Sequence, residues 1–228
     1  MKTILFQGDS ITDCERTREL PSNIIEKLYV KANYIMQGRT ELGFGYPAMV
    51  AKELGDEGYT FINRGVGGDR IPDVYARIVR DIIKVRPDVM SLLVGVNDVW
   101  HGLDWNNGTG IKRFEKVFNI LFEELTQELP DTRFIILGAF VLEGTATADR
   151  PDQPDRYRLF REGVAQVAAI ERAVAEKYGI RFVDLGKILD EEAQKHTAKA
   201  LTGDGVHPTE KGHEIIKREW LKAFNELD

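Results

Sequence analysis

Cysteine and long apolar runs are nearly absent from this sequence. Its 228 residues include one cysteine, Cys14, so no intramolecular disulfide can form and nothing indicates a secreted, disulfide-stabilised domain. The apolar run that follows Lys2 is too short for the core of a signal peptide. No segment approaches the roughly 18 consecutive apolar residues of a membrane-spanning helix. These absences predict a cytoplasmic protein without a membrane partner.

An excess of positive charge is also missing. Lys and Arg together number 31 against 37 Asp and Glu, which gives a formal net charge of −6. Proteins that bind nucleic acid or anionic lipid usually present a basic patch, so neither partner is expected. A small-molecule partner fits this composition better.

The composition is sufficient for one globular domain. Hydrophobic residues make up 43% of the chain, which can supply a continuous core. We find no internal repeat, low-complexity tract or linker. The sequence therefore predicts a single domain over residues 1–228.

Apolar segments of strand length alternate with helical patterns along the chain. The predicted strands are the run before Gly8, Tyr59 to Asn63, Asp88 to Val94, Arg133 to Gly138 and Ile180 to Leu185. Helical patterns lie at 11–16, 47–54, 72–84, 110–129, 156–178 and 210–224, and the polar segment before Pro47 is predicted as a long loop or a flap. Such alternation predicts a three-layer α/β/α fold with a five-stranded parallel sheet in the flavodoxin-like order 2-1-3-4-5, its first strand central.

Residues suited to acyl chemistry follow the first three predicted strands. Ser10, Gly68 and Asn97 should converge, because the carboxyl ends of parallel strands share one edge of the sheet. The segment before the last helix can add Asp204 and His207 there. A serine nucleophile needs a neighbouring base, and a histidine base needs a carboxylate on its other nitrogen. A glycine N–H and an asparagine amide can both donate to a substrate oxygen.

Four ordered blocks carry a family resemblance. They are Gly8-Asp9-Ser10-Ile11-Thr12, Gly65-Val66-Gly67-Gly68-Asp69, Gly95-Val96-Asn97-Asp98 and Asp204-Gly205-Val206-His207-Pro208. With these blocks the chain resembles the SGNH (GDSL-type) hydrolases from residue 1 to about residue 220. The resemblance implies that Ser10 is the nucleophile, His207 the general base and Asp204 the acid that orients it. It also implies an oxyanion hole made of the Ser10 N–H, the Gly68 N–H and Asn97.

Flanking segments suggest a narrower resemblance. The runs at 11–16, 42–46, 96–100 and 140–144 resemble the intracellular acetylxylan-esterase-like branch, whose members remove acetyl groups from short xylo-oligosaccharides. The resemblance implies a serine esterase for acetyl or other short-chain esters. Gly203 is a departure, because some of these esterases have an aromatic residue at that position.

Four residues beside the blocks are candidates for substrate binding: Tyr46, Arg64, Trp100 and His101. Tyr46, Trp100 and Trp105 can stack on a sugar, although aromatic residues are most often core or interface residues. Arg64 can bind a substrate hydroxyl or pair with Asp98, and we favour the pair. His101 either lines the pocket or faces solvent. Aromatic residues near the mouth of the site would also suit a homo-oligomeric contact.

Several nearby residues have structural interpretations. Gly8-Asp9-Ser10 is also typical of a turn, in which Ser10 is a helix N-cap. Asp9 and Asp98 are expected to accept backbone N–H bonds near the Ser10 loop. His213 is interpreted as a surface or packing residue of the last helix, and Cys14 as a buried, inert thiol.

Other functions fit the sequence less well. A dinucleotide-binding loop needs a third glycine where Arg70 stands, and His207 and His213 lack the spacing and partners of a zinc site, so no cofactor or metal is expected. A non-catalytic carbohydrate-binding protein would be expected to have lost Ser10 or His207. Long-chain lipase activity would need an apolar groove, whereas segments 14–46 and 139–155 are polar. The alternatives that stay open are a broad short-chain carboxylesterase, a thioesterase and a lysophospholipase.

Overall fold

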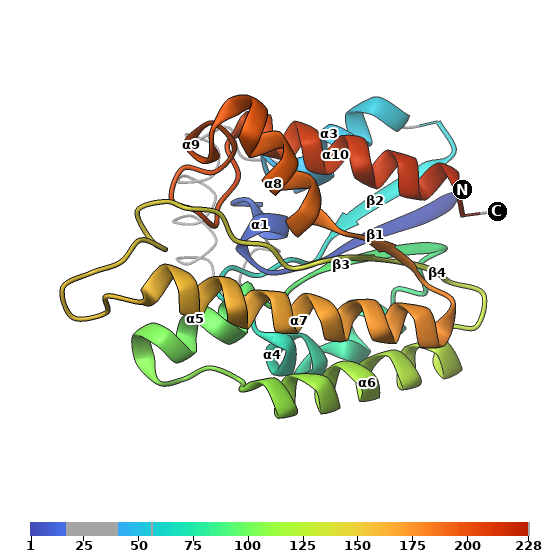
Figure 1. Cartoon of the computed structure of the whole chain (residues 1–228). Coiled ribbons are helices and arrows are strands. Elements are labelled where there is room, and N and C mark those ends of the chain that lie inside the picture. The colour runs from blue at the N-terminus through green and yellow to red at the C-terminus, as the bar shows by residue number, and fades with distance from the viewer. Residues whose placement is uncertain (17–40, 56, 228) are drawn as a thin grey trace, which may run out of the picture.

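Five parallel strands form the centre of the molecule (Figure 1). The computed structural model describes residues 1–16, 41–55 and 57–227, so most of the predicted loop or flap before Pro47 lies outside the described residues. The strands lie in the order β2-β1-β3-β4-β5, which confirms the predicted topology. β1 is an inner strand, but β3 is the middle one. The strands are β1 (Lys2–Gly8), β2 (Tyr59–Asn63), β3 (Val89–Leu93), β4 (Arg133–Leu137) and β5 (Arg181–Val183).

Helices cover both faces of this sheet and make the three predicted layers (Figure 1). One layer contains α3 packed against α10, with α8 beside them, and the other contains α6 packed against α7 and α4. The helices are α1 (Ser10–Asp13), α3 (Tyr46–Leu54), α4 (Ile71–Ala76), α5 (Val96–Trp105), α6 (Ile111–Glu128), α7 (Arg156–Tyr178), α8 (Leu185–His196), α9 (Ala198–Leu201) and α10 (Glu210–Asn225), with a π-helical turn η1 (Val79–Ile83).

Two helical regions differ from the prediction. The expected helix over 72–84 is interrupted at Arg77, where α4 ends before η1 begins. Helix α5 was not predicted at all, because its ten residues VNDVWHGLDW mix polar, aromatic and glycine residues without a clear apolar stripe. α5 begins directly after β3, at the edge of the sheet where the predicted site residues lie.

The inner strands are buried on both faces. Ile4, Leu5 and Phe6 of β1 have no exposed surface, and Phe6 contacts Trp220 of α10 with a ring-centre distance of 5.4 Å. Burial of each such side chain contributes about 1.5–3 kcal/mol to folding. β1 is therefore a firm support for the residues that follow it.

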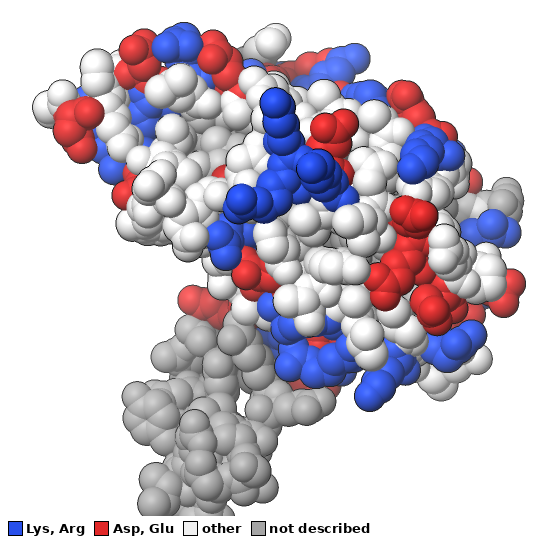
Figure 2. All heavy atoms as spheres, turned by 90° about the horizontal axis from the view of Figure 1, so that it is seen from below, with Lys and Arg blue, Asp and Glu red and all other residues white. Residues whose placement is uncertain are grey.

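Acidic and basic side chains are interspersed over the face of the molecule shown in Figure 2. That face shows no broad area of positive charge alone. In the described part of the chain, none of the helices has the length and apolar character needed to cross a membrane.

Candidate active site

The turn after β1 places Ser10 at the start of a helix. The carboxylate of Asp9 accepts a hydrogen bond from the Ile11 N–H at 3.0 Å, so Asp9 is the N-cap of α1 and Ser10 is its first residue. The N-cap interpretation of Ser10 is therefore wrong. The N–H groups of a first helical turn have no acceptor within the helix, so the Ser10 N–H is not used by α1. Burial raises the pKa of Asp9 to about 7.

A glycine is required immediately before this turn. A Cβ added at Gly8 would lie 2.2 Å from the carbonyl oxygen of Leu93 and 2.4 Å from the hydroxyl of Thr12. Such contacts are far below van der Waals separation, so no other residue fits without movement of the backbone. Gly8 thus lets β1 and the end of β3 approach closely beneath Ser10.

Ser10, His207 and Asp204 form a continuous chain of hydrogen bonds. Ser10 Oγ lies 2.9 Å from His207 Nε2, and His207 Nδ1 lies 2.7 Å from Asp204 Oδ2. The other Asp204 oxygen accepts the backbone N–H groups of Val206 and His207 at 2.9 and 2.7 Å. With the proton on His207 Nδ1 and donated to the Asp204 carboxylate, Nε2 is free to accept the serine proton.

The pKa values of this pair are shifted in the directions that suit a base and its orienting acid. Burial opposes ionisation of Asp204, but the hydrogen bonds from the His207 ring and from two backbone N–H groups outweigh it and hold its pKa at about 2. The hydrogen bond to Asp204 raises the pKa of His207, and burial offsets part of that rise.

The loop between β4 and α7 packs against the turn that carries Asp204. Ala146 N–H donates to the carbonyl of Asp204 at 2.9 Å, and Leu142 N–H donates to that of Gly205 at 2.8 Å. A Cβ at Gly144 would lie 2.2 Å from the backbone of Asp204, so this packing requires glycine. The loop between β4 and α7 therefore fixes the position of the turn that carries Asp204 and His207.

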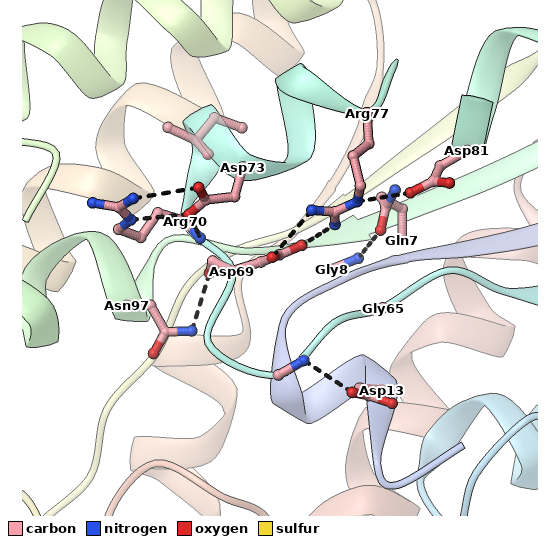
Figure 3. A network of polar contacts seen from close by, with 12 residues as sticks. Gln7, Gly8, Asp13, Gly65, Asp69, Arg70, Asp73, Arg77, Asp81 and Asn97 are labelled. Atoms are coloured by element: carbon pink, nitrogen blue, oxygen red, sulfur yellow. Dashed lines mark hydrogen bonds and ion pairs between the residues drawn. The ribbon is translucent and has the colours of Figure 1, made fainter. Parts of the chain in front are cut away.

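The glycine-rich segment after β2 forms a tight turn beside Ser10. The Asp69 N–H donates to the carbonyl of Val66 at 3.1 Å, and Gly68 has φ +84° at the third position of this turn. That geometry is typical of a type II turn, which favours glycine there. The hydrogen bond of the turn does not use the Gly68 N–H, and Gly68 is exposed. Nearby, Asn97 Nδ2 donates to the carbonyl of Asp69 at 3.0 Å (Figure 3).

The candidate substrate-binding residues occupy different environments. Trp100 is half-buried, and its ring centre lies 6.0 Å from that of His207. His101 contacts Trp105 edge to face at 4.8 Å, and Trp105 is 62% exposed. Burial lowers the pKa of His101. Arg64 is half-buried in the segment after β2.

The prediction that Tyr46 binds substrate is wrong. Tyr46 has no exposed surface, its ring contacts Phe6 at 5.8 Å, and its hydroxyl lies 3.0 Å from Thr12 Oγ1. It begins α3 and packs beneath the site. Its backbone N–H donates to Nδ1 of His213 at 3.2 Å, so His213 is a packing residue rather than a surface residue, and burial lowers its pKa to about 4.

Other predicted structural roles differ in detail. The carboxylate of Asp98 accepts the Ile71 N–H at 3.1 Å and also binds the hydroxyl of Thr109. It thus holds the segment after β2 rather than the Ser10 loop. Burial raises the pKa of the Cys14 thiol, although Cys14 is not fully buried, and its Sγ lies 3.6 Å from His213 Nε2.

Sequence reasoning missed a buried arginine that connects two parts of the site. Arg156 is fully buried, pairs with Asp104 at 2.6 Å and donates from Nε to the carbonyl of Ala146 at 2.9 Å. Asp104 in turn accepts the Trp100 indole N–H at 2.6 Å. Nothing in the sequence around Arg156 distinguishes it from a surface residue of an amphipathic helix.

The arrangement is suited to acyl transfer. A serine hydroxyl, an oriented histidine and N–H donors at one edge of a sheet are the groups required to attack a carbonyl and stabilise the resulting oxyanion. Within the described ranges there is no cluster of three residues that could hold a metal ion.

Comparison with known proteins places this geometry among ester hydrolases. The model of the GDSL-like Lipase/Acylhydrolase family matches residues 6–215. An acetylxylan esterase of Geobacillus stearothermophilus is 27% identical over 97% of this chain and 93% of its own length.

Solved structures agree with the sequence matches. Axe2, an acetylxylan esterase from Geobacillus stearothermophilus, has a TM-score of 0.77 at 27% identity, covering 97% of this chain and 93% of that one. A structure from Parabacteroides merdae, provisionally assigned as a GDSL-like lipase, has a TM-score of 0.80 at 26% identity, covering 98% of this chain and 95% of that one. Axe2 variants in which a serine or an aspartate is replaced by alanine are described as catalytic mutants.

Proposed function

The chain belongs to the GDSL-like lipase/acylhydrolase family and is a carboxylic ester hydrolase, and from this premise we propose that it removes acetyl groups from acetylated sugars through an acyl-enzyme on Ser10. The observation that carries the proposal is the hydrogen-bonded chain from Ser10 through His207 to Asp204, with distances of 2.9 and 2.7 Å. The resemblance to acetylxylan esterases favours xylo-oligosaccharides as the acetylated substrate.

In the proposed first half-reaction, neutral His207 accepts the Ser10 proton at Nε2 as Oγ attacks the acetyl carbonyl carbon. Negative charge develops on the carbonyl oxygen, which accepts hydrogen bonds from the Ser10 N–H, the Gly68 N–H and the Asn97 amide. Asp204 holds the His207 ring and stabilises its protonated form. When the tetrahedral intermediate collapses, the bond to the sugar oxygen breaks and His207 gives its proton to that oxygen.

In the second half-reaction, water takes the place of the sugar alcohol. His207 accepts a proton from water, the resulting hydroxide attacks the acetyl-Ser10 carbonyl, and the same donors stabilise the oxyanion. Cleavage of the bond to Oγ releases acetic acid, which ionises to acetate in water, and the proton returns from His207 to Ser10. These steps use only groups of this chain, the ester and water.

The position of Trp100 supports a sugar ester. The Trp100 ring lies beside His207, which protonates the leaving alcohol, so this side suits the sugar. Flat aromatic faces pack well against sugar rings, because both the indole face and the C–H groups of the sugar are apolar.

Replacement of Ser10 tests the nucleophile. We expect Ser10→Ala to lose hydrolysis of p-nitrophenyl acetate and labelling by a fluorophosphonate, because Oγ forms the acyl bond. Its thermal unfolding midpoint should stay close to that of the wild type, because Asp9, not Ser10, caps α1. Wild-type turnover in Ser10→Ala would contradict the proposal.

A substrate series tests the acyl length and the sugar. Initial rates on p-nitrophenyl acetate, butyrate and laurate should fall with chain length, and acetylated xylobiose should be cleaved with release of acetate. A preference for laurate would indicate a lipase or lysophospholipase instead. Equal rates on acetylated xylobiose and on simple alkyl acetates would indicate a broad short-chain carboxylesterase.

A further inference from the structure

A network of charged side chains lies beside the glycine turn and joins Asp69, Arg77 and Asp81 (Figure 3). The carboxylate of Asp69 is buried and pairs with both terminal nitrogens of Arg77. Arg77 Nε also donates to Asp81 at 2.9 Å. Arg77 stands where α4 ends before η1, so the break in the predicted 72–84 helix is also the point at which its guanidinium spans two carboxylates.

Asp69 has three connections to the proposed oxyanion hole. It follows Gly68 directly in the chain, and its N–H closes the turn on Val66 at 3.1 Å. Its carbonyl accepts the Asn97 amide at 3.0 Å. Two of the three proposed oxyanion donors therefore depend on where the backbone of Asp69 lies, although its side chain points the other way, toward Arg77 (Figure 3).

Hydrogen bonds that do not involve Arg77 hold the two ends of this segment. Gly67 N–H donates to Asp13 at 2.9 Å, and the Ile71 N–H donates to Asp98 at 3.1 Å. These bonds fix the two ends of the segment, whereas the ion pair fixes its middle. A buried carboxylate whose cation is removed must find other donors or water, and the backbone that bears it then moves.

We propose that Asp69 and Arg77 are positioning residues of the oxyanion hole, which hold the turn so that the Gly68 N–H and the Asn97 amide meet over Ser10. This rests on the proposed esterase function. Neither side chain touches the substrate. Both act through donors whose contribution is largest when charge has developed in the transition state, so kcat should be affected more than KM.

Arg77→Met and Arg80→Met form a matched pair. Arg80 pairs with Asp81, as Arg77 does, but its side chain is 72% exposed and the structure shows no pairing between it and Asp69. With p-nitrophenyl acetate, we expect kcat of Arg77→Met to fall about 10- to 100-fold, below the roughly 10²–10³-fold expected when a whole donor is removed. KM should change less than about 3-fold, and Arg80→Met should stay within about 2-fold of the wild type. Arg77→Lys, which keeps a cation, should recover part of the loss.

A double variant separates positioning from general destabilisation. Because Arg77 acts through Asn97 and Gly68, its loss should cost less when Asn97 is already alanine, so the two effects should not multiply. Each kcat is expressed per serine titrated with a fluorophosphonate, so unfolded enzyme is not counted, and Arg77→Lys supplies the measurement if Arg77→Met does not fold.

Three results would overturn the proposal: an unchanged kcat in Arg77→Met, losses that multiply with Asn97→Ala, or a rise in KM at constant kcat. Activity that survives in Ser10→Ala would instead refute the proposed function, whatever the Arg77 variants do. The two failures are therefore distinguishable.

Discussion

His207 is the residue whose protonation should control the rate. Only its neutral form accepts the Ser10 proton, and its hydrogen bond to Asp204 raises its pKa above the ordinary 6.5. We therefore expect kcat/KM for p-nitrophenyl acetate to fall with decreasing pH along an acid limb that lies above pH 6.5. Such a profile would describe an esterase most active on the alkaline side of neutrality.

Asp204→Asn should lower kcat and also move the acid limb of the pH profile. Asparagine keeps an acceptor for the N–H groups of Val206 and His207 but cannot stabilise the protonated ring. We expect kcat to fall by about 10³–10⁴-fold and the acid limb to move to lower pH, because the raised His207 pKa depends first on Asp204. A limb at the wild-type pH in this variant would show that another group titrates.

Contacts between residues that are close in the chain were the easiest to predict from the sequence. Asp204 and His207 are three residues apart in one turn, so their contact could be predicted from spacing alone. The parallel topology brings Ser10 to them from the end of the first strand. Tyr46 was misassigned because an aromatic residue beside a motif is as compatible with the core as with a substrate surface. The roles of Arg77 and Arg156 depend on partners in other elements, and no spacing reveals such partners.

At the scale of elements, every strand that the structure describes was predicted, whereas helix α5 was missed and the helix predicted over 72–84 is interrupted. β2 has the predicted bounds, because its residues are β-branched and aromatic and are enclosed by turns. α5 was missed although it carries Asn97, Trp100 and Asp104, since the functional residues displace the apolar pattern that identifies a helix. A segment at the carboxyl edge of a sheet that lacks the usual apolar pattern of a helix or strand is thus itself a signal of function.

α5, α7 and the loop before α7 are joined by one buried ion pair. Arg156→Met would leave the Asp104 carboxylate and the Ala146 carbonyl without the guanidinium, so we expect a loss of about 3–5 kcal/mol in the free energy of unfolding. Urea unfolding measures this loss. Arg158→Met is a matched control, since Arg158 lies on the same helix and forms exposed pairs with Asp155 and Glu162. Equal stability of the two variants would contradict the assignment.

At the scale of the whole molecule, the fold encloses three acidic side chains below the site. Burial raises the pKa of Asp9 and of Asp98 to about 7 and that of Glu171 well above its usual value. Glu171 accepts the Ala139 N–H at 2.8 Å, so it supports the loop after β4. A sheet covered on both faces has little water at its inner strands, and carboxylates placed there stay protonated more readily than in the unfolded chain.

These raised pKa values predict how stability depends on pH. The unfolded chain releases the protons of Asp9 and Asp98 near pH 4, whereas the folded protein keeps them until about pH 7. The folded state therefore binds more protons between these values, and the free energy of unfolding should decrease as pH rises through this window. Asp204, with a pKa of about 2, acts in the opposite sense and loses its stabilising effect as pH falls below 4.

Asp98→Asn isolates one of these groups. Asparagine can still accept the Ile71 N–H but has no charge to bury. The decrease in unfolding free energy between pH 5 and pH 8 should therefore shrink by up to about 3 kcal/mol, because Asp98 contributes roughly 1.4 kcal/mol for each pH unit between pH 5 and its folded pKa of about 7. Urea unfolding at the two pH values measures the difference, with exposed Asp131→Asn as the control. If Asp98→Asn kept the full wild-type decrease, the pH dependence would have to come from Asp9 and Glu171, and Asp98 would be ionised in the folded protein at pH 5.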